Sequence, residues 1–339
     1  MAKKRVKPPA AEPPTDDAHS SAALLTELDT LRRLRDKTQR RLPAWQTVLQ
    51  ALGNSDFGIV LDFALEHGLV LALSADPAKR RGERNANLSW INPIDGSEMV
   101  WIPPGPFVIG ADKKPAESTG FSLARYPVTN AQFKRFLDET GYHPPPEHPA
   151  PQVFLSHWAN GAPPKGEQHH PVVWVSFLDA LAYCKWAGLA LPSEWLWEKA
   201  ARGPDGRAYP WGDGAPQVIG GSAKSSKPLT NVHSDGTCPV GNYPRTRTPY
   251  GCEDVVGNVS EWCQMTDEKN PGRIPDAWPD MTIDTTGPIQ YAAVRGSCFL
   301  RTNWARMVSW HRRRLSTTRR NQWVGFRPAF FQAWRPAEE

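Results

Sequence analysis

The apolar positions in the N-terminal quarter of the chain recur at the spacing of amphipathic helices. Leu24, Leu28 and Leu31 lie three or four residues apart with charged side chains between them, which predicts a helix. Further apolar stripes, separated by Pro and Gly, predict additional helical turns. We therefore expect a small helical module over residues 21–77, after a tail of Pro, Ala and charged residues over 1–20.

A polar, basic segment separates this module from a region with a different pattern. Residues 78–94 begin with a stretch that is nearly free of apolar side chains, which predicts a linker. The run MVWIPPGPFVIG at 99–110 then places two short apolar stretches around a Pro-rich turn and predicts a hairpin-like start. We expect a second domain over 95–332 and a short tail over 333–339.

Two short helices are predicted within the second domain. The apolar positions of 129–141 fit a helix with Asn130 or Thr129 as its N-cap. The segment 176–187 begins with Ser and carries Asp179 three residues later, an arrangement similar to a capping box. The remainder of the domain has few long periodic stretches, so we expect it to be rich in loops.

The composition is ordinary for a globular protein except in Trp and Pro. The chain has 339 residues, a net charge of +5, 22% charged and 40% hydrophobic residues, which excludes disorder throughout. Its 15 Trp and 34 Pro predict irregular structure around large buried rings. Five cysteines without CxxC spacing, no secretory signal and no membrane-spanning stretch predict reduced thiols and a cytoplasmic protein without a membrane anchor.

Four sequence blocks in the second domain point to a known family. They are YPVTNAQF at 126–133; PVVWVS at 171–176 with LPSEWLWEKAARG at 191–203 and YPWG at 209–212; PVG at 239–241 with GNVSEW at 257–262; and VRGS at 294–297 with GFR at 325–327. In this order they resemble the formylglycine-generating enzyme (sulfatase-modifying factor) superfamily. The resemblance covers about residues 97–330 and implies an α+β, C-type lectin-like domain.

Two carboxylates within these blocks allow two interpretations. Glu194 and Glu198 are four residues apart, so a helix places both on one face. Such a pair fits general acid and base catalysis. Ion pairing with Arg202 or Lys199 is the interpretation that we favour.

The third block carries oxygen ligands. Gly257-Asn258 fits a tight turn with positive φ, and Asn258 and Glu261 present the hard oxygen atoms that calcium prefers. The resemblance implies a structural calcium ion here, with Asn258 and Glu261 among its ligands. Asn231 and Asp235 are candidates for a second calcium site. Capping of turns by the same side chains, without a metal, is the alternative at both places.

The oxidases of the resembled family hold copper with two cysteines a few residues after the Gly-Ser of the last block. The corresponding positions fall near Leu300 and near Trp304 or Ala305, and Cys298 is the only thiol in this stretch. Because Cu(I) is a soft ion that a pair of thiolates holds, we expect neither copper nor formylglycine generation.

Other relatives form carbon–sulfur bonds with an iron ion that histidines hold, mostly from an added helical bundle. The N-terminal region of this chain contains only His19 and His67, which are too few for three ligands. His169 and His170 are adjacent, so in an extended segment they point in opposite directions. We therefore expect exposed loop histidines and no iron.

A binding surface is what remains, and the chemistry of the C-terminal segment 298–323 supports it. The segment is rich in Arg and Trp, the residue types that are enriched at the energetic centres of interfaces. We expect a non-catalytic domain that binds a protein or other macromolecular ligand, while the helical module serves self-association or partner docking. The candidate ligand-binding residues are Ser297, Phe299, Leu300, Arg301, Trp304, Arg306, Trp310, His311, Arg314, Arg320 and Trp323.

Three further interpretations stay open, of which the second is a subclass of the binding role. A divergent oxidase would use Cys298 with a thiol from elsewhere, such as Cys184 or Cys263. The layout also resembles the target proteins of diversity-generating retroelements, whose variable segment lies between Arg-Gly-Gly-Ser and Gly-Phe-Arg; here the first signature is reduced to Arg295-Gly296-Ser. A contact between the basic segment and nucleic acid is the third alternative, which we do not favour.

Overall fold

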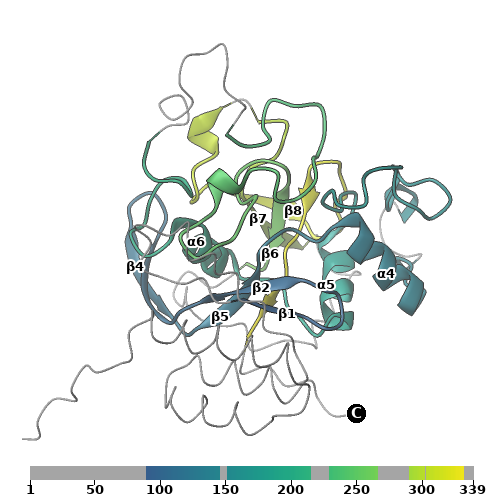
Figure 1. Ribbon diagram of the computed structural model, residues 1–339, viewed down its shortest axis with the longest axis horizontal. Coiled ribbons are helices and arrows are strands. Elements are labelled where there is room, and N and C mark those ends of the chain that lie inside the picture. Colours follow the sequence, from purple (N-terminus) through teal and green to yellow (C-terminus); the bar gives the residue numbers. More distant parts are fainter. Residues whose placement is uncertain (1–88, 146–150, 215–228, 266–289, 302, 332–339) are drawn as a thin grey trace, which may run out of the picture. The chain divides into compact units, whose positions relative to one another are not determined.

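The computed structural model describes residues 89–145, 151–214, 229–265, 290–301 and 303–331 (Figure 1). All of them belong to one of two compact units of the chain, which comprises Leu52–Ser74 and Asn87–Glu339. The predicted helical module and both predicted tails lie outside the described residues, which all fall after residue 88 and before residue 332.

The first and last described strands belong to one antiparallel sheet. Its strands run in the order β1 (Ser89–Ile91), β2 (Glu98–Ile102), β5 (Phe121–Ala124) and β10 (Ala329–Phe330). Trp90 and Phe330 pack edge to face, with ring centroids 5.3 Å apart. β1 falls in the segment that we predicted as linker, so the domain begins earlier than residue 95, because the buried ring of Trp90 is part of its core.

The predicted hairpin over 99–110 is wrong. Both apolar runs form strands, but β2 pairs with β1 and β5, whereas the next run, β3 (Gly105–Ile109), pairs with β4 (Lys114–Ser118) in a separate two-stranded sheet. Prolines at 103–104 lie between the two runs, and a prolyl nitrogen cannot donate a hydrogen bond to a neighbouring strand. The chain therefore leaves the first sheet at this point.

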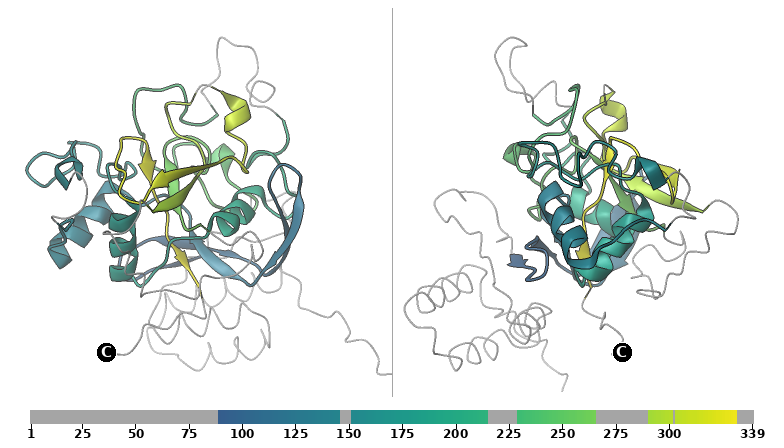
Figure 2. Two further views of the ribbon diagram at one scale, coloured as in Figure 1. Left: turned by 180° about the vertical axis from the view of Figure 1, so that it is seen from behind. Right: turned by 90° about the vertical axis from the view of Figure 1, so that its right-hand side faces the viewer.

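A second four-stranded sheet includes one strand of the C-terminal segment (Figure 2). Its strands run in the order β8 (Arg312–Ser316), β7 (Tyr291–Arg295), β6 (Ser260–Cys263) and β9 (Val324–Gly325). β6 and β9 are parallel and the other pairs are antiparallel. β7 and β6 are the two inner strands of this sheet, and every residue of β6 is buried.

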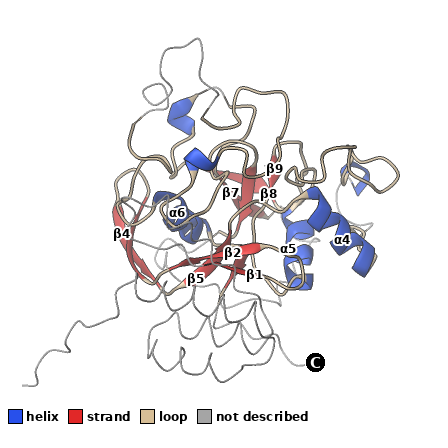
Figure 3. Ribbon diagram, in the orientation of Figure 1, coloured by secondary structure: helices blue, strands red, loops and turns tan. Residues whose placement is uncertain are grey.

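Three helices and three short 3₁₀ turns complete the described domain (Figure 3). They are α4 (Asn130–Thr140), α5 (Phe177–Trp186), α6 (Glu194–Arg202), η2 (Pro151–Val153), η3 (Pro244–Thr246) and η4 (Trp304–Arg306). Thr129 and Gln132 form a capping box at the start of α4, and Ser176 and Asp179 form one at the start of α5. Both helix predictions are confirmed. None of the helices in the described ranges has the length and apolar character needed to cross a membrane.

Large rings make up much of the core. Trp197 and Trp262 are fully buried, and Trp262 Nε1 donates to the carbonyl of Val175 at 3.1 Å. The rings of Phe133 and Tyr183 are stacked with centroids 5.7 Å apart. A buried aromatic side chain removes about 150–250 Å² of surface from solvent. The packing of these rings therefore stabilises the loops of a domain that has few long helices or strands among its described residues. The prediction of a loop-rich fold around tryptophan is confirmed for the described residues.

Candidate functional site

A buried network of charged side chains ties α6 to the start of the C-terminal segment. Glu198 accepts a hydrogen bond from Arg202 at 2.7 Å, and Arg295 donates to its other carboxylate oxygen. These three side chains are at most 1% exposed. Glu194 accepts from Arg312 at 2.8 Å. The interpretation of Glu194 and Glu198 as ion-pairing groups, with Arg202 as one partner, is confirmed.

The carboxylate of Glu261 is bound by protein donors. Arg327 donates to both of its oxygens, at 2.6 and 2.7 Å, and Trp197 Nε1 donates to one of them at 2.6 Å. All three side chains are fully buried. Each oxygen of this predicted calcium ligand therefore faces a donor, and a cation has no place between them.

Asn258 lies in the predicted tight turn. Gly257 and Asn258 have φ of 89° and 61°, so the prediction of positive φ is confirmed. The side chain of Asn258 accepts from the amide of Cys238 and donates to its carbonyl, both at 3.0 Å. These two bonds join the turn to a neighbouring loop, which is the capping role that we named as the alternative to a metal.

The second predicted calcium site also lacks a set of free oxygen ligands among the described residues. Asn231 Oδ1 accepts from the hydroxyl of Ser234 at 2.6 Å, and Asp235 is exposed to solvent. Within the described ranges, no group of three or more His, Cys, Asp or Glu side chains is placed to hold a metal ion. The four predicted ligands therefore do not fit calcium in this arrangement, because three of them, Asn231, Asn258 and Glu261, already bind protein groups.

Three of the predicted ligand-binding residues are interior. Ser297 accepts a hydrogen bond from the Gly257 amide at 3.0 Å, and Phe299 is 2% exposed. Arg320 is 4% exposed and donates to both oxygens of Asp179, at 2.8 and 3.0 Å. The expectation that these side chains contact a ligand is corrected, because each one is used in packing or in a buried ion pair.

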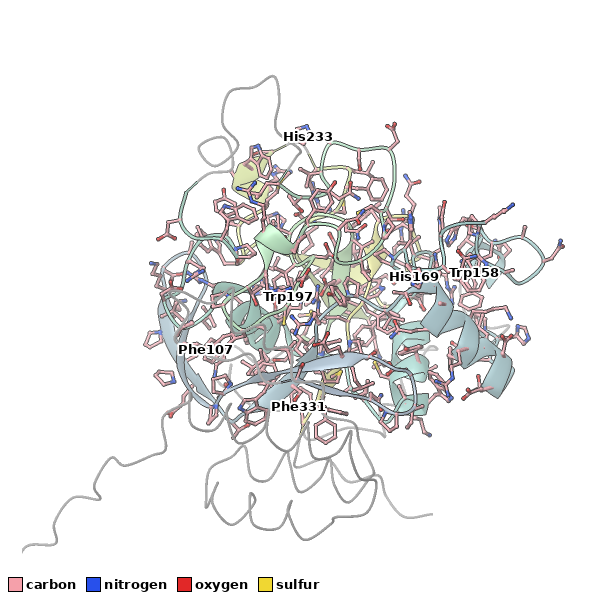
Figure 4. The ribbon with its side chains drawn as sticks, in the orientation of Figure 1. Phe107, Trp158, His169, Trp197, His233 and Phe331 are labelled. Atoms are coloured by element: carbon pink, nitrogen blue, oxygen red, sulfur yellow. The ribbon has the colours of Figure 1, made fainter. Side chains whose placement is uncertain are left out.

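Other predicted residues gather around the 3₁₀ turn η4. Leu300 is 46% exposed, Arg306 is exposed, and Arg301, Trp304 and His311 are half-buried. His233, from a distant loop, lies against Trp304 with ring centroids 6.2 Å apart, and Figure 4 shows it beside this turn. We call this group the η4 surface. Its members are His233, Leu300, Arg301, Trp304, Arg306 and His311.

His233 was not predicted from the sequence, and no spacing or motif connects it to the C-terminal segment. Two backbone hydrogen bonds place its loop there: the His233 amide donates to the carbonyl of Arg301 at 3.3 Å, and the Ser234 amide donates to that of Phe299 at 3.2 Å. Contacts of this kind between distant segments leave no periodic signal in a sequence.

The remaining predicted residues lie on or beside β8. The guanidinium of Arg202 lies 4.7 Å from the ring centroid of Trp310, and that of Arg313 lies 5.3 Å from the ring centroid of Trp323. Both Trp rings are half-buried, and Arg314 is exposed. The two rings are thus partly covered by cations of the protein itself.

The imidazole of His311 lies in a positive environment. Burial lowers its pKa, and the nearby Arg301, Arg295 and Arg306 lower it further. A guanidinium disfavours the addition of a proton to a neighbouring imidazole. His311 is therefore neutral near pH 7, whereas Arg301 and Arg306 of the η4 surface stay charged.

The candidate thiols are buried. Burial raises the pKa of Cys298, and it raises the pKa of Cys184 and Cys263 well above the ordinary value. All three are free cysteines. Since the thiolate is the form that binds metals and reacts, these sites are poorly suited to either role.

A pocket of about 450 Å³ was not predicted from the sequence. Its lining includes Glu98, Tyr126, Gln132 and His169 from segments that are far apart in the chain. The polar groups are largely engaged: Glu98 accepts from Arg125 at 2.7 Å, and Gln132 accepts from the Thr129 amide at 2.9 Å. The pocket therefore offers few free polar groups to orient a ligand.

The sequence matches known proteins over this domain. The model of the family described as sulfatase-modifying factor enzyme 1-like domain matches residues 90–330. The formylglycine-generating enzyme of Mus musculus is 32% identical over 244 residues, which are 56% of this chain and 65% of that protein. Hercynine oxygenase of Mycolicibacterium smegmatis is 32% identical over 213 residues, 52% of this chain and 47% of that protein. The chain thus spans about half to two thirds of the length of these relatives.

The chain is also similar to a protein that is described as inactive and to a solved structure. Inactive C-alpha-formylglycine-generating enzyme 2 of Mus musculus is 32% identical over 217 residues, 50% of this chain and 68% of that protein. PvdO from Pseudomonas aeruginosa has a similar structure, with a TM-score of 0.53 and 21% identity over 71% of this chain and 97% of that chain. The α+β, C-type lectin-like fold expected from the four sequence blocks is confirmed. Because the family model covers more than half of the sequence, the chain belongs to the sulfatase-modifying factor enzyme 1-like domain family.

Proposed function

We propose that this chain is a non-catalytic recognition protein that binds a protein ligand through the η4 surface. The observation that carries the proposal is the set of side chains that follows Ser297. The resemblance places the copper cysteines of the oxidases near Leu300 and near Trp304 or Ala305. This chain has an aliphatic, an aromatic and a methyl side chain there instead of sulfur.

The thiol that is present nearby does not restore an oxidase site. Cys298 is 2% exposed, and burial raises its pKa, so it is protonated at neutral pH. A lone buried thiol cannot supply the pair of thiolates that Cu(I) requires.

The exposed side chains of the same segment are suited to recognition. Leu300 is exposed and the ring of Trp304 is half-buried, and Arg301 and Arg306 flank Trp304 in sequence. Arg and Trp are enriched among the residues that dominate binding energy at protein interfaces. This combination supports a protein ligand.

The relatives are described both as enzymes and as an inactive protein, so their names support both a catalytic and a non-catalytic reading. The alternative is a divergent oxidase that combines Cys298 with Cys184 or Cys263. A copper-dependent oxidation assay separates the two. The full chain is incubated with copper, oxygen, a reductant and a Cys-containing peptide of the sulfatase type, and the product is analysed by mass spectrometry.

We expect no oxidised product from this assay, and we expect the copper titration of Cys298→Ala to match that of the wild type. Formylglycine formation, or tighter copper binding by the wild type than by Cys298→Ala, would overturn the proposal in favour of the oxidase. Cys238→Ala is the matched control, because Cys238 is also a thiol with a raised pKa but was not a candidate ligand.

Three further expectations belong to this proposal. The chain acts in the cytoplasm without a membrane anchor, its helical module serves self-association or partner docking, and segment 298–323 is genetically diversified. The third is tested in the neighbouring DNA, where a template repeat and a reverse transcriptase gene are expected. A binding role does not depend on diversification, so the absence of both leaves the η4 surface as proposed.

A further inference from the structure

Two arginines of the η4 surface have no carboxylate partner among the described residues. Arg312 and Arg320, from the same segment, each pair with a buried carboxylate. Arg301 and Arg306 form no ion pair with any residue that the structure describes, and neither takes part in a cation–π contact there. Asp235 is exposed on the loop of His233 and pairs with neither of them. No carboxylate in the described part of the chain therefore compensates their charge.

The backbone that carries these two arginines is held in place. The hydroxyl of Tyr209 donates to the carbonyl of Trp304 at 3.2 Å, and Asn303 Oδ1 accepts from the amide of Ala305 at 3.0 Å. Arg301 follows a tight turn in which its amide donates to the carbonyl of Cys298 at 3.0 Å. A ligand that binds here has little backbone to order, which lowers the cost of binding.

Within the described ranges, no acidic side chain pairs with Arg301 or Arg306. Of the two histidines of the surface, His311 has a pKa that is lowered by burial and by Arg301, Arg295 and Arg306. An anion that binds between Arg301 and Arg306 would remove part of this repulsion and make protonation of His311 easier.

We propose that the η4 surface binds an acidic peptide segment of a partner protein: carboxylates of the partner pair with Arg301 and Arg306, and its apolar side chains contact Leu300 and Trp304. This inference rests on the proposed function and names the ligand class of that site. Arginine suits such contacts because its planar guanidinium can bind a carboxylate with two parallel hydrogen bonds.

A protein partner fits this surface better than nucleic acid does. Specific DNA-binding proteins often make about 6–10 phosphate contacts, and they align many cations along the phosphate backbone. Here Arg312 and Arg320 of the same segment pair with carboxylates inside the domain. The ring of Trp304 is half-buried against His233, so it does not offer an open face for base stacking.

Fluorescence anisotropy with the full chain tests the proposal. The probe is a labelled peptide, Asp-Glu-Leu-Asp-Glu-Leu-Asp-Glu, and the uncharged control has Asn and Gln in place of Asp and Glu. We expect saturable binding of the acidic peptide alone. Arg301→Gln and Arg306→Gln should each weaken it about tenfold, which corresponds to ~1.4 kcal/mol. Arg319→Gln, an equal charge change at another exposed position of the segment, should change it less than about twofold.

A second readout is the pKa of His311, measured by NMR titration of the imidazole. Saturating acidic peptide should raise this pKa, and the uncharged peptide should leave it unchanged. Equal losses for Arg319→Gln and Arg301→Gln, an unchanged pKa, or no binding of the acidic peptide would overturn the proposal. So would tighter binding of a ten-residue oligothymidylate than of the peptide. The oxidation assay tests the proposed function independently of the peptide experiment. If the chain shows no turnover and does not bind the acidic peptide, the proposed ligand class is wrong and the proposed non-catalytic function stands.

Discussion

Arg327 donates through Nε and Nη2 to the two carboxylate oxygens of Glu261, and neither side chain is exposed. The other terminal nitrogen of the guanidinium donates to the carbonyls of Ala124 and Arg125, and Nη2 also donates to the carbonyl of Glu253. One side chain thus connects the C-terminal part of the domain with β5, with β6 and with the loop before β6. We therefore expect this ion pair to contribute to the free energy of unfolding of the domain.

Glu261→Gln should lower the free energy of unfolding by about 3–5 kcal/mol, because it leaves the guanidinium of Arg327 buried without its counter-charge. Urea denaturation of the full chain measures the change. Glu139→Gln removes a carboxylate from an exposed pair with Arg135 and should cost less than about 1 kcal/mol. Similar losses in the two variants would contradict a structural role for the buried pair.

Calcium should have little effect on stability. Glu261 and Asn258 are engaged by Arg327 and Cys238, so the side chains that the resemblance assigned to calcium have no free oxygen to offer. We expect the melting temperature in excess calcium and in excess EDTA to agree within about 2 °C, since a ligand that binds the folded state raises it. A melting temperature that is higher in calcium by more than this margin would show that backbone carbonyls and Asp235 suffice to bind the ion. It would support the calcium prediction.

Gly257→Ala should destabilise the domain by about 2 kcal/mol or more. Gly257 has φ +89°, and an added Cβ would overlap the hydroxyl of Thr230 and lie 2.7 Å from the carbonyl oxygen of Asn231. Thermal unfolding measures the loss. Gly236→Ala is the control, because a Cβ at Gly236 meets no atom within 4 Å, and the structure gives that glycine no positive φ.

Stability should fall in acid through His157. Burial lowers its pKa from 6.5 to about 4, and neither ring nitrogen has a hydrogen-bond partner among the described residues. Because the unfolded chain binds this proton more readily, the contribution is complete above pH 6.5 and is lost as the pH falls towards 4.

The test of this effect compares melting temperatures at about pH 7 and about pH 4.5 for the wild type and for His157→Phe, which cannot titrate. The wild type should lose more stability between the two conditions than the variant. Equal losses would mean that His157 is accessible to protons in the folded protein. His169→Phe, at an exposed histidine, should behave like the wild type.

Local features of the fold were predictable from the sequence. The capping boxes at Thr129 and Ser176 depend on residues three positions apart, and the positive φ at Asn258 depends on one turn. The pairing of β2 and β3 was not predictable in this way, because both runs have the pattern of strands and only the surrounding sheet decides their partners. The resemblance to a family supplied the fold that local patterns could not.

The candidate surface was predictable only in outline. Arg and Trp marked the segment, but they did not separate Arg320, whose partner Asp179 is 141 residues away, from Arg301 and Arg306, which pair with no carboxylate that the structure describes. The counter-charge of a buried arginine comes from another element, so it has no signature near the arginine itself. Burial and ion pairing in the folded chain removed Ser297, Phe299 and Arg320 from the predicted set, and the η4 surface contains five of the residues that remain.

The sheet that contains both β1 and β10 has a consequence for how this domain can be used. In Figure 1 that sheet lies below α6, whereas the 3₁₀ turn η4 lies above it. A tag, a surface anchor or a second protein joined directly to either of these two strands would be attached on the side of the sheet, away from η4. The described domain can therefore be immobilised through β1 or through β10 with the η4 turn directed outwards.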